Sequence, residues 1–364
     1  MHSVADTVAV FDSSNRESWE NWFHALPAAL QDINFSFDYQ MLYELNGDGS
    51  IRLFIYKEQD SIFYYPFLIR AISNSVIGDG YLDIENVYGY TGPLWSSQDS
   101  GFREHASEAF HTWCKEHKVV CEFIRFHPLL HNAIEAKKEK DISVIPLRDY
   151  VFVNLEQTEN EIFDSYTSQN RNKIRKAEKN GVAIIVDQEL SYFDDFVRIY
   201  TDNMKSLNAA RMYFFSSPFY TQLKKLVKEK GFLILAIKDN VVLGSSVFLG
   251  EGNIGHYFLS SAIDEGKKLA VSNLMLHAGI LEGRKRGMKI MHLGGGITPE
   301  ESDPLLVFKK NFSSKTEKFY IGKRIFDQGT YDLLIQDWDQ RFLEEAPKYK
   351  SILQRYRWEK QDLL

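Results

Sequence analysis

Three consecutive glycines and one lysine have the types and positions that could do chemistry. Gly294, Gly295 and Gly296 follow a predicted strand, and glycine lets backbone amides approach a ligand closely and form anion-binding turns. The triplet could therefore cradle a phosphate or a reacting carbonyl group, or it could be a flexible turn. Lys309 lies on a predicted short helix. A fixed cation there could stabilise negative charge on a carbonyl oxygen, although a lysine next to a second lysine is usually just solvated.

A second group of residues is basic and shares one face of a predicted helix. Arg171, Arg175 and Lys179 fall at positions i, i+4 and i+8, and Lys176 adds a further charge beside them. Such a stripe could bind the phosphates of a tRNA or the pyrophosphate of a nucleotide sugar. The alternative is a solvated helix surface, which the presence of Glu178 in the stripe also fits.

Metal sites and covalent nucleophiles are not indicated by the sequence. His127 and His131 are four residues apart, but Pro128 between them argues against a shared helix face, and no third ligand is obvious. A nucleophilic serine is not supported either, because no Gly-x-Ser-x-Gly elbow occurs. We therefore expect no metal and no covalent enzyme intermediate.

The first half of the chain is predicted to form a mixed α/β layer. Residues Ser14 to Glu17 have the pattern of a capping box, which predicts the start of an aromatic-rich helix that Pro27 ends. Runs rich in β-branched and aromatic residues then predict strands. A longer run of mixed polar and apolar residues predicts a second helix. The expected strands are 51–56, 62–69, 82–88 and 119–126, and the expected helix is 102–117.

The second half repeats this plan more clearly. A strand at 150–155 is followed by a capping box from Thr158 to Glu161, which opens a helix that Gly181 closes. The later strands are predicted at 182–187, 232–238, 241–249, 254–261, 288–293 and 318–321, and the later helices at 192–206, 218–230, 270–286 and 305–311. The three central strands form a meander, which implies a mixed, mostly antiparallel sheet with helices on its faces. This order of elements matches the GNAT fold.

Length and composition bound the architecture. A chain of 364 residues is long enough for two domains, and its 44% hydrophobic and 14% aromatic content argues against disorder and against a coiled coil. We expect the α/β class, with two GNAT-like domains at 1–148 and 149–328, each a mixed mostly antiparallel sheet flanked by helices. We expect residues 329–364 to form a C-terminal helix that packs back on the domains.

Charge and cysteine content limit the partners and the compartment. The net charge of −7 shows no global basic excess, so any contact with nucleic acid must be local. Two cysteines, no leader pattern and no apolar run of membrane-spanning length favour a soluble protein in a reducing cytoplasm. Such a protein would reach a membrane-bound substrate from outside, so peripheral membrane contact stays open.

Three motifs resemble the Fem-type aminoacyl transferases of the GNAT superfamily. The helix at 168–181 resembles the family's segment of Arg, then Ile-Arg-Lys-Ala, then Gly. The loop at 88–93, Tyr-Gly-Tyr-Thr-Gly-Pro, resembles a family loop that has Gly in place of Thr91. The segment 288–296, followed by Phe308-Lys309 and Phe312, resembles the strand, glycine turn and Phe-Lys box near the family's active site. The resemblance covers the second half almost throughout and the first half loosely.

The chain departs from its relatives in two respects. It has no long charged helical-hairpin insertion, so it resembles the compact members of the Fem family. The GNAT loop for coenzyme A, Gln/Arg-x-x-Gly-x-Gly/Ala before a helix, is not evident at 264–271. An ordinary acetyl-CoA site is therefore disfavoured.

The resemblance implies transfer of an aminoacyl group from aminoacyl-tRNA to an amine of a cell-wall precursor of the peptidoglycan type, or of a glycan precursor. Lys309 is implied to face a cleft between the two domains, where it and backbone amides stabilise the oxyanion formed by direct attack. The general base is left open between a nearby carboxylate such as Asp303 and the substrate itself. The residues implied for substrate binding, besides the glycine triplet, are Tyr88, Tyr90, Arg211, Tyr213, Tyr257 and Phe308. The two tyrosines of the 88–93 loop could equally be packing residues.

Two other functions remain open at this point. The first is an acyl-CoA-dependent N-acyltransferase that acts on an amino sugar or a lipid. The second is a noncatalytic binding protein with the same fold. We expect no bound cofactor. In either enzyme the acyl donor, aminoacyl-tRNA or acyl-CoA, is a co-substrate. The sequence does not indicate an oligomeric state.

Overall fold

The chain, described here from a computed structural model over residues 7–360, divides into two compact units. Among these residues the first unit comprises 7–30, 34–146 and 320–360, and the second comprises 31–33 and 147–319. The main part of the second unit begins at residue 147. The chain returns to the first unit at residue 320, and the C-terminal segment belongs there.

The sheet of the first unit has the strand order β1-β2-β3-β4-β6-β13. Its strands are β1 (Thr7–Phe11), β2 (Ser50–Glu58), β3 (Ser61–Ala71), β4 (Leu82–Glu85), β6 (Val119–Arg125) and β13 (Thr316–Ile325), with β5 (Leu94–Trp95) beside β3. β4 pairs with β6 in parallel, and β1–β2, β2–β3, β3–β4 and β6–β13 are antiparallel. The sheet is therefore mixed and mostly antiparallel, as predicted.

Helices cover this sheet and complete its core. They are α1 (Arg16–Ala25), α2 (Phe37–Asn46), α3 (Ser100–Glu116), α4 (Asn132–Ala136) and α12 (Gln328–Arg341), with short 3-10 turns η1 (Ala28–Leu30), η2 (Ile33–Phe35) and η4 (Arg355–Arg357). Aromatic side chains dominate the core under α3, where Phe110 packs edge-on against Phe54 and Phe67. Of the C-terminal segment, residues 328–341 are helical, and turns follow up to residue 360.

The capping box predicted at the start of α1 is wrong. Asn15 is the N-cap residue, and no side chain caps the helix. Ser14 instead directs both its backbone amide and its hydroxyl to the carboxylate of Asp12, at 2.9 and 2.6 Å. This local Asp turn competes successfully with the helix cap, as short polar side chains often do.

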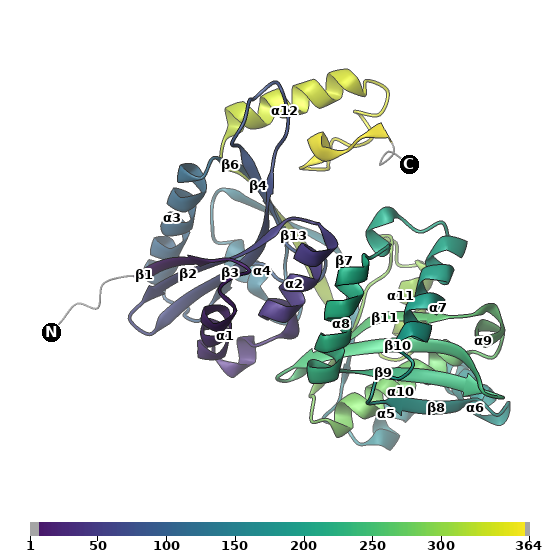
Figure 1. Ribbon diagram of the computed structural model, residues 1–364. Coiled ribbons are helices and arrows are strands. Elements are labelled where there is room, and N and C mark those ends of the chain that lie inside the picture. The colour runs from purple at the N-terminus through teal and green to yellow at the C-terminus, as the bar shows by residue number, and fades with distance from the viewer. Residues whose placement is uncertain (1–6, 361–364) are drawn as a thin grey trace. The chain divides into compact units, whose positions relative to one another are not determined.

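The second unit, which carries the glycine triplet, has the strand order β7-β12-β11-β10-β9-β8 (Figure 1). Its strands are β7 (Ile142–Asn154), β8 (Ala183–Asp187), β9 (Gly231–Lys238), β10 (Val241–Glu251), β11 (Ile254–Ala262) and β12 (Ile290–Gly294). β11 and β12 are parallel, and the other neighbours are antiparallel. The predicted meander of three strands is confirmed as β9-β10-β11.

Helices pack on both faces of this sheet. They are α5 (Glu159–Ser165), α6 (Ser168–Lys179), α7 (Phe193–Ser206), α8 (Ser217–Lys230), α9 (Asp264–Lys268), α10 (Val271–Lys285) and α11 (Pro304–Lys310), with the 3-10 turn η3 (Arg211–Tyr213). Figure 1 shows α7 and α8 on one face and α10 on the other. On the α10 face, Gly279 lies against the ring of Phe248, where an added Cβ would come within 2.0 Å of a ring carbon. This close approach requires glycine.

One predicted helix of the second unit is two helices. The capping box of Thr158 and Glu161 is confirmed and opens α5, but α5 ends at Ser165. Tyr166 is extended, with φ −69° and ψ 153°, and Thr167 caps the next helix, α6, by accepting from the Asn170 amide. Burial of the Tyr166 ring in the core, at 2% exposure, stabilises this break.

The predicted fold class, α/β with two units of mixed sheet and flanking helices, is confirmed. Over the described residues, no helix combines the length and the apolar composition that a membrane span needs.

Candidate active site

The glycine triplet forms a tightly packed turn between β12 and α11. Gly294 has φ +80°, a conformation that favours glycine. An added Cβ on Gly295 would lie 2.1 Å from the ring of Tyr150, and one on Gly296 would lie 2.5 Å from the carboxyl of Asp303. The triplet is thus a fixed element of the structure, because each glycine meets a separate steric requirement.

Asp303 fastens the loop that follows the triplet. One carboxylate oxygen accepts hydrogen bonds from the amides of Leu305 and Leu306 at the start of α11, at 2.9 and 3.0 Å. The other accepts from the amides of Ile297 and Thr298, at 3.0 and 2.9 Å, and from the Thr298 hydroxyl. Burial raises the pKa of Asp303, but these hydrogen bonds together outweigh it and lower the pKa to about 2. A carboxylate held in this way is a weak base at neutral pH, so its geometry fits a role in positioning the loop.

Lys309 points into the same loop from the last turn of α11. Its side chain is buried, with only 8% of the residue exposed, and Nζ donates to the Gly295 carbonyl oxygen at 2.7 Å. Burial lowers the pKa of Lys309 to about 7, the carboxylate of Asp303 opposes this shift, and Arg148 adds to it. The amine therefore gains or loses its proton close to neutral pH, unlike a solvated lysine.

Arg148 holds the loop from β7. Its Nη1 donates to the carbonyl oxygens of Gly296 and Ile297, at 2.6 Å each. These bonds and those of Asp303 act on consecutive residues of the loop. The backbone that carries the Lys309 acceptor is therefore fixed on two sides.

A chain of amides joins α11 to the neighbouring helices. The carbonyl oxygen of Asn311, just after α11, accepts from the Thr167 amide at 3.1 Å and from Nδ2 of Asn170 at 3.1 Å. Asn170 is buried, and its Oδ1 accepts from Nδ2 of Asn273 on α10 at 2.8 Å. Burying these amides is favourable because they satisfy one another. The Lys309 helix is thereby tied to α6 and α10.

The basic residues of α6 fall into two groups. Arg171 is bonded to the protein itself, since Nη1 donates to the carbonyl oxygens of Asp164 and Tyr166 at the end of α5. Arg175 lies over the ring of Phe163, 5.3 Å from its centre. Lys176 and Lys179 are exposed on the last turn of α6. The stripe is thus one structural arginine followed by an exposed basic surface.

The remaining predicted residues of the second unit lie on other elements. Arg211 is exposed and Tyr213 half-buried on η3. Tyr257 lies on β11, where its ring packs 5.4 Å from that of Phe248 on the α10 face. Burial raises the pKa of Tyr257, and hydrogen bonds with two serine hydroxyls oppose the shift. Phe308 is half-buried beside Lys309 and packs edge-on against Phe312. Of the predicted residues, the structure therefore brings together Lys309, Asp303, the glycine triplet and Phe308.

Tyr88 and Tyr90 belong to the first unit. Tyr88 is 42% exposed, and its carbonyl oxygen accepts from the hydroxyl of Tyr39 at 3.0 Å. Tyr90 is half-buried, with its ring edge-on to His127. Gly89 between them has φ +142° and lies against the side chain of Tyr39. The loop is therefore held by its packing within the first unit.

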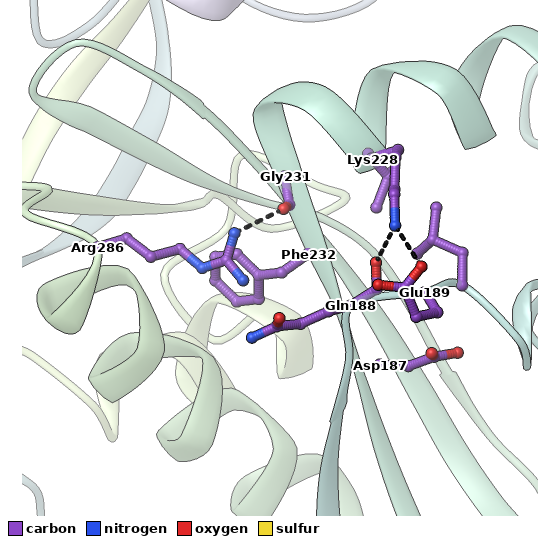
Figure 2. A pocket seen from close by; sticks show the side chains of 9 residues that line it. Asp187, Gln188, Glu189, Lys228, Gly231, Phe232 and Arg286 are labelled. Atoms are coloured by element: carbon purple, nitrogen blue, oxygen red, sulfur yellow. Dashed lines mark hydrogen bonds and ion pairs between the residues drawn. The ribbon is translucent and has the colours of Figure 1, made fainter.

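Figure 2 shows a surface pocket of the second unit, and none of the residues that line it belongs to the loop of the glycine triplet and Lys309. The pocket is shallow, with a volume of about 240 Å³, and lies where β8 ends and β9 begins. That end of the sheet also holds the start of β12, whereas the glycine triplet follows the end of β12. Its basic groups are already bonded: Arg286 donates to the Gly231 carbonyl oxygen at 3.0 Å, and Lys228 to Glu189 at 2.7 Å. Small volume and satisfied charges make this pocket a weak candidate for a ligand site.

Three side chains of the first unit bring metal-ligating atoms close together. They are His111, Glu139 and Asp141. The guanidinium of Arg324 already lies among them, donating to Glu139 and placing Nε 3.3 Å from Asp141. Burial and Arg324 both lower the pKa of His111, against the effect of Asp141. A built-in cation thus balances these carboxylates.

Sequence reasoning missed Arg148, the amide chain and a buried pair formed by Asp32 and His256. Arg148 is a single arginine before a strand, and Asn170, Asn273 and Asn311 are far apart in the chain. No spacing or motif marks any of them. Asp32 and His256 are 224 residues apart, so no helical or metal-ligand spacing marks the pair in the sequence.

Comparison with known proteins supports the fold and leaves the activity open. No family model and no curated protein sequence matches the chain. Among solved structures, FemX matches with TM-score 0.64 and 13% identity, covering 90% of this chain and 99% of FemX. The C-terminal domain of a putative lysylphosphatidylglycerol synthetase from Agrobacterium fabrum matches with TM-score 0.55 and 12% identity, over 91% and 97% of the two chains. L-PGS from Bacillus licheniformis matches with TM-score 0.53 and 10% identity, also over 91% and 97%. The chain therefore shares its fold with FemX, with the C-terminal domain of a putative lysylphosphatidylglycerol synthetase and with L-PGS.

Proposed function

We propose that this protein is an acyltransferase that moves an aminoacyl group from aminoacyl-tRNA to an amine of a cell-wall or glycan precursor. The single observation that carries the proposal is Lys309, a buried amine fixed at 2.7 Å from the Gly295 carbonyl oxygen with a pKa lowered to about 7. Perturbed titratable groups of this kind are concentrated at functional sites. The fold shared with FemX and with the lysylphosphatidylglycerol synthetase domain agrees with acyl-group chemistry.

In this proposal the acceptor amine attacks the aminoacyl ester directly. Negative charge then develops on the carbonyl oxygen, and the ammonium form of Lys309 stabilises it. Arg148 and Asp303 hold the loop so that Lys309 needs little rearrangement when the charge appears. The exposed Lys176 and Lys179 of α6 contribute positive charge for the phosphates of the donor.

The proposal is tested by measuring which ligands the purified protein binds. Isothermal titration calorimetry and thermal shift would use uncharged tRNA, a UDP-linked muramyl peptide and coenzyme A, because a ligand that binds the native state raises its apparent stability. Saturable binding of tRNA or of the muramyl peptide, without binding of coenzyme A, is the expected result. Saturable binding of coenzyme A alone would instead identify a thioester-dependent N-acyltransferase.

A transfer assay then separates an enzyme from a noncatalytic binding protein. Total tRNA charged with radiolabelled amino acids serves as the donor and the UDP-linked muramyl peptide as the acceptor. Label appearing in the acceptor, and its loss in Lys309→Met, is the expected outcome. Tight binding of both ligands with no transfer would show that the protein binds without catalysing.

A further inference from the structure

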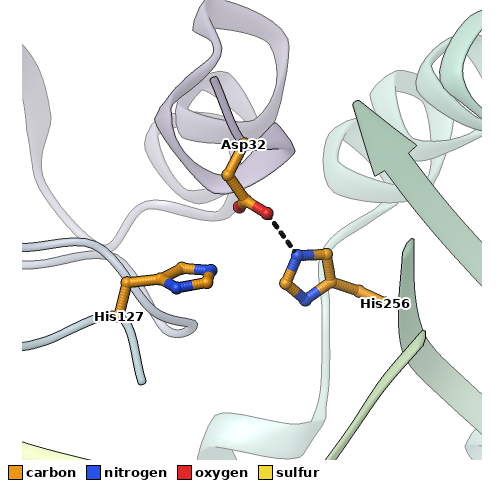
Figure 3. Close-up of side chains that lie close together, drawn as sticks. All are labelled: Asp32, His127 and His256. Carbon is orange, nitrogen blue, oxygen red and sulfur yellow. Dashed lines mark hydrogen bonds and ion pairs between the residues drawn. The ribbon is translucent and has the colours of Figure 1, made fainter. Parts of the chain in front are cut away.

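A buried carboxylate and imidazole face each other within the second unit (Figure 3). Nε2 of His256 lies 2.7 Å from Oδ2 of Asp32, and their side chains are 6% and 0% exposed. Taking two such groups out of water is unfavourable unless their contacts compensate. Neither residue takes part in the proposed steps at Lys309, so the pair calls for a function of its own.

The strand register shows which face of the sheet the pair occupies. His256 is opposite Leu249, Leu259 is opposite Val247, and Ser261 is opposite Ser245. These pairs share one face because Leu249, Val247 and Ser245 alternate along β10, and a bulge in β11 between His256 and Leu259 keeps their partners opposite them. The residues between them face α10, since Phe248 packs against Gly279 of that helix. His256 therefore points away from α10.

Contacts on this face connect the pair to the Lys309 loop. His256 is opposite His292, where the parallel pairing of β11 with β12 ends, and their ring centres are 5.2 Å apart. His292 contacts Tyr150, 5.5 Å away, and Tyr150 packs against Gly295. Gly295 in turn accepts the bond from Lys309. His292 and Gly295 are three residues apart at the end of β12, so the pair and the Lys309 loop lie at neighbouring positions along the chain.

Two buried hydroxyls on the same face add an independent observation. Ser245 and Ser261 are 0% and 4% exposed, and their Oγ atoms have no hydrogen-bond partner among the described residues. A buried hydroxyl without a hydrogen-bond partner destabilises the fold. The hydroxyls lie at the end of β11 that is level with the glycine triplet. A polar ligand bound along this face would satisfy them.

We propose that His256, oriented by Asp32, is the general base that removes the proton from the acceptor amine. This inference rests on the proposed function and names the group which that function leaves open. When Nε2 of His256 donates to Asp32, Nδ1 is the ring nitrogen that accepts a proton in general-base catalysis, and Asp32 orients the ring. Asp32 acts through His256 and is a positioning residue.

The proton and the electron pairs balance in this step. The amine nitrogen forms a bond to the carbonyl carbon of the aminoacyl ester, and its proton passes to Nδ1 of His256. The carbon–oxygen bond of the ester then breaks, and the leaving oxygen of the donor takes that proton. The imidazole is restored, so no further reactant is needed.

The experiment compares His256→Gln, Asp32→Asn and the wild type in the transfer assay with charged total tRNA and UDP-linked muramyl peptide. General-base catalysis contributes ~10²–10⁴-fold, so we expect His256→Gln to lower kcat at least 100-fold with KM for both substrates within twofold. Asp32→Asn should lower kcat less. The matched control is His111→Gln in the first unit, which should leave kcat unchanged. Added imidazole should restore part of the activity of His256→Ala.

The outcomes separate this inference from the proposed function. Suppose that the wild type transfers the aminoacyl group and that the kcat of His256→Gln lies within threefold of the wild-type kcat. This result would overturn only the role of His256. No transfer by the wild type from aminoacyl-tRNA would overturn the proposed function and the inference with it. If His256→Gln melts early, Asp32→Asn decides, because asparagine keeps the size and one hydrogen-bonding oxygen. An unchanged kcat in a folded Asp32→Asn variant would then contradict the role of Asp32 and His256 in proton transfer.

Discussion

Lys309 illustrates how burial changes a residue that looks ordinary in the sequence. A lysine next to another lysine on a short helix is usually solvated, yet this side chain lies inside the loop and its pKa is lowered to about 7. Its environment comes from Gly295 and Asp303, which precede it in the same loop, and from Arg148, which is distant in the chain. The chemistry of the site is therefore a property of the closed loop.

Replacing Lys309 should separate activity from stability. We expect Lys309→Met to lower the transfer rate ~10²–10³-fold, as loss of one oxyanion-stabilising group does. Because the folded-state pKa lies below the value of 10.5 for a free lysine, the native state resists protonation, and the wild type loses stability as pH falls from about 10.5 to about 7. The Lys309→Met variant does not lose stability in this way. The difference in melting temperature, variant minus wild type, should therefore be larger at pH 6 than at pH 10.

The neighbouring lysine provides the control for that experiment. Lys310→Met changes a half-buried lysine on the same helix and should leave both rate and melting temperature nearly unchanged. Full activity in Lys309→Met, or equal losses in the two variants, would contradict a direct role for Lys309.

Asp303 should behave as an anchor of the loop. We expect Asp303→Asn to lower the free energy of unfolding at pH 7 by on the order of 1–3 kcal/mol, because the variant loses hydrogen bonds to a charged carboxylate. The pKa of Asp303 is lowered to about 2, so its stabilisation is fully present above about pH 3.8 and disappears as pH falls through 2. Urea unfolding should show a gap between wild type and variant that is constant from pH 7 to pH 4.5 and closes at lower pH. A gap that is absent at pH 7 would rule out the anchoring role.

At the scale of the element, α6 carries two kinds of basic residue that spacing alone does not distinguish. Arg171 is bonded to the end of α5, whereas Lys176 and Lys179 are exposed. The break between α5 and α6 at Tyr166 creates this difference, because it brings carbonyl oxygens of the preceding helix within reach of Arg171. A continuous helix would leave the whole stripe exposed.

The two kinds of residue should respond differently to substitution. We expect the double variant Lys176→Glu, Lys179→Glu to bind tRNA several-fold more weakly in fluorescence anisotropy. The slope of log affinity against log salt should fall by about 0.9 for each phosphate that the variant no longer neutralises. Arg171→Ala should instead lower the melting temperature and leave the affinity nearly unchanged. Weakened tRNA binding in a fully stable Arg171→Ala would show that this arginine also binds the ligand.

At the scale of the whole molecule, charge is distributed unequally between surface and interior. The chain has a net charge of −7, and the first unit buries a charged cluster that includes Arg324. Glu122 lies at its centre, fully buried, accepting from the Tyr65 hydroxyl at 2.5 Å and lying 3.4 Å from Arg324. Burial raises the pKa of Glu122 to about 7 against the opposing effects of Arg324 and Tyr65.

This buried carboxyl should make the first unit less stable as pH rises. The folded-state pKa lies above the unfolded value of 4.5, so the native state binds more protons between pH 4.5 and pH 7, and the free energy of unfolding falls as pH rises through that range. One pKa unit corresponds to ~1.4 kcal/mol, so we expect a loss of on the order of 1–3 kcal/mol. Glu122→Gln should remove this dependence in calorimetric unfolding, whereas the half-buried control Glu135→Gln should keep it. A steep dependence that persists in Glu122→Gln would contradict the assignment.

The sequence by itself determined the class of the fold and most of its elements. Alternating and helical periodicity sets secondary structure locally, so the meander β9-β10-β11, the capping box of α5 and the short helix α11 were predicted near their observed positions. Glycine and lysine at 294–296 and 309 were marked by composition and by a family resemblance. Competing local bonds defeated the prediction at Ser14, where an Asp turn replaces the helix cap.

Only the tertiary structure decided which side chains act together. Arg148 reaches the loop of Gly296 from another strand, and Asp32 meets His256 across most of the chain. It also decided the protonation behaviour of Lys309, Asp303 and Glu122, whose residue types alone predict ordinary values. The physical reason is that burial and long-range hydrogen bonds set the free energy of a charged group, and neither is encoded in local spacing.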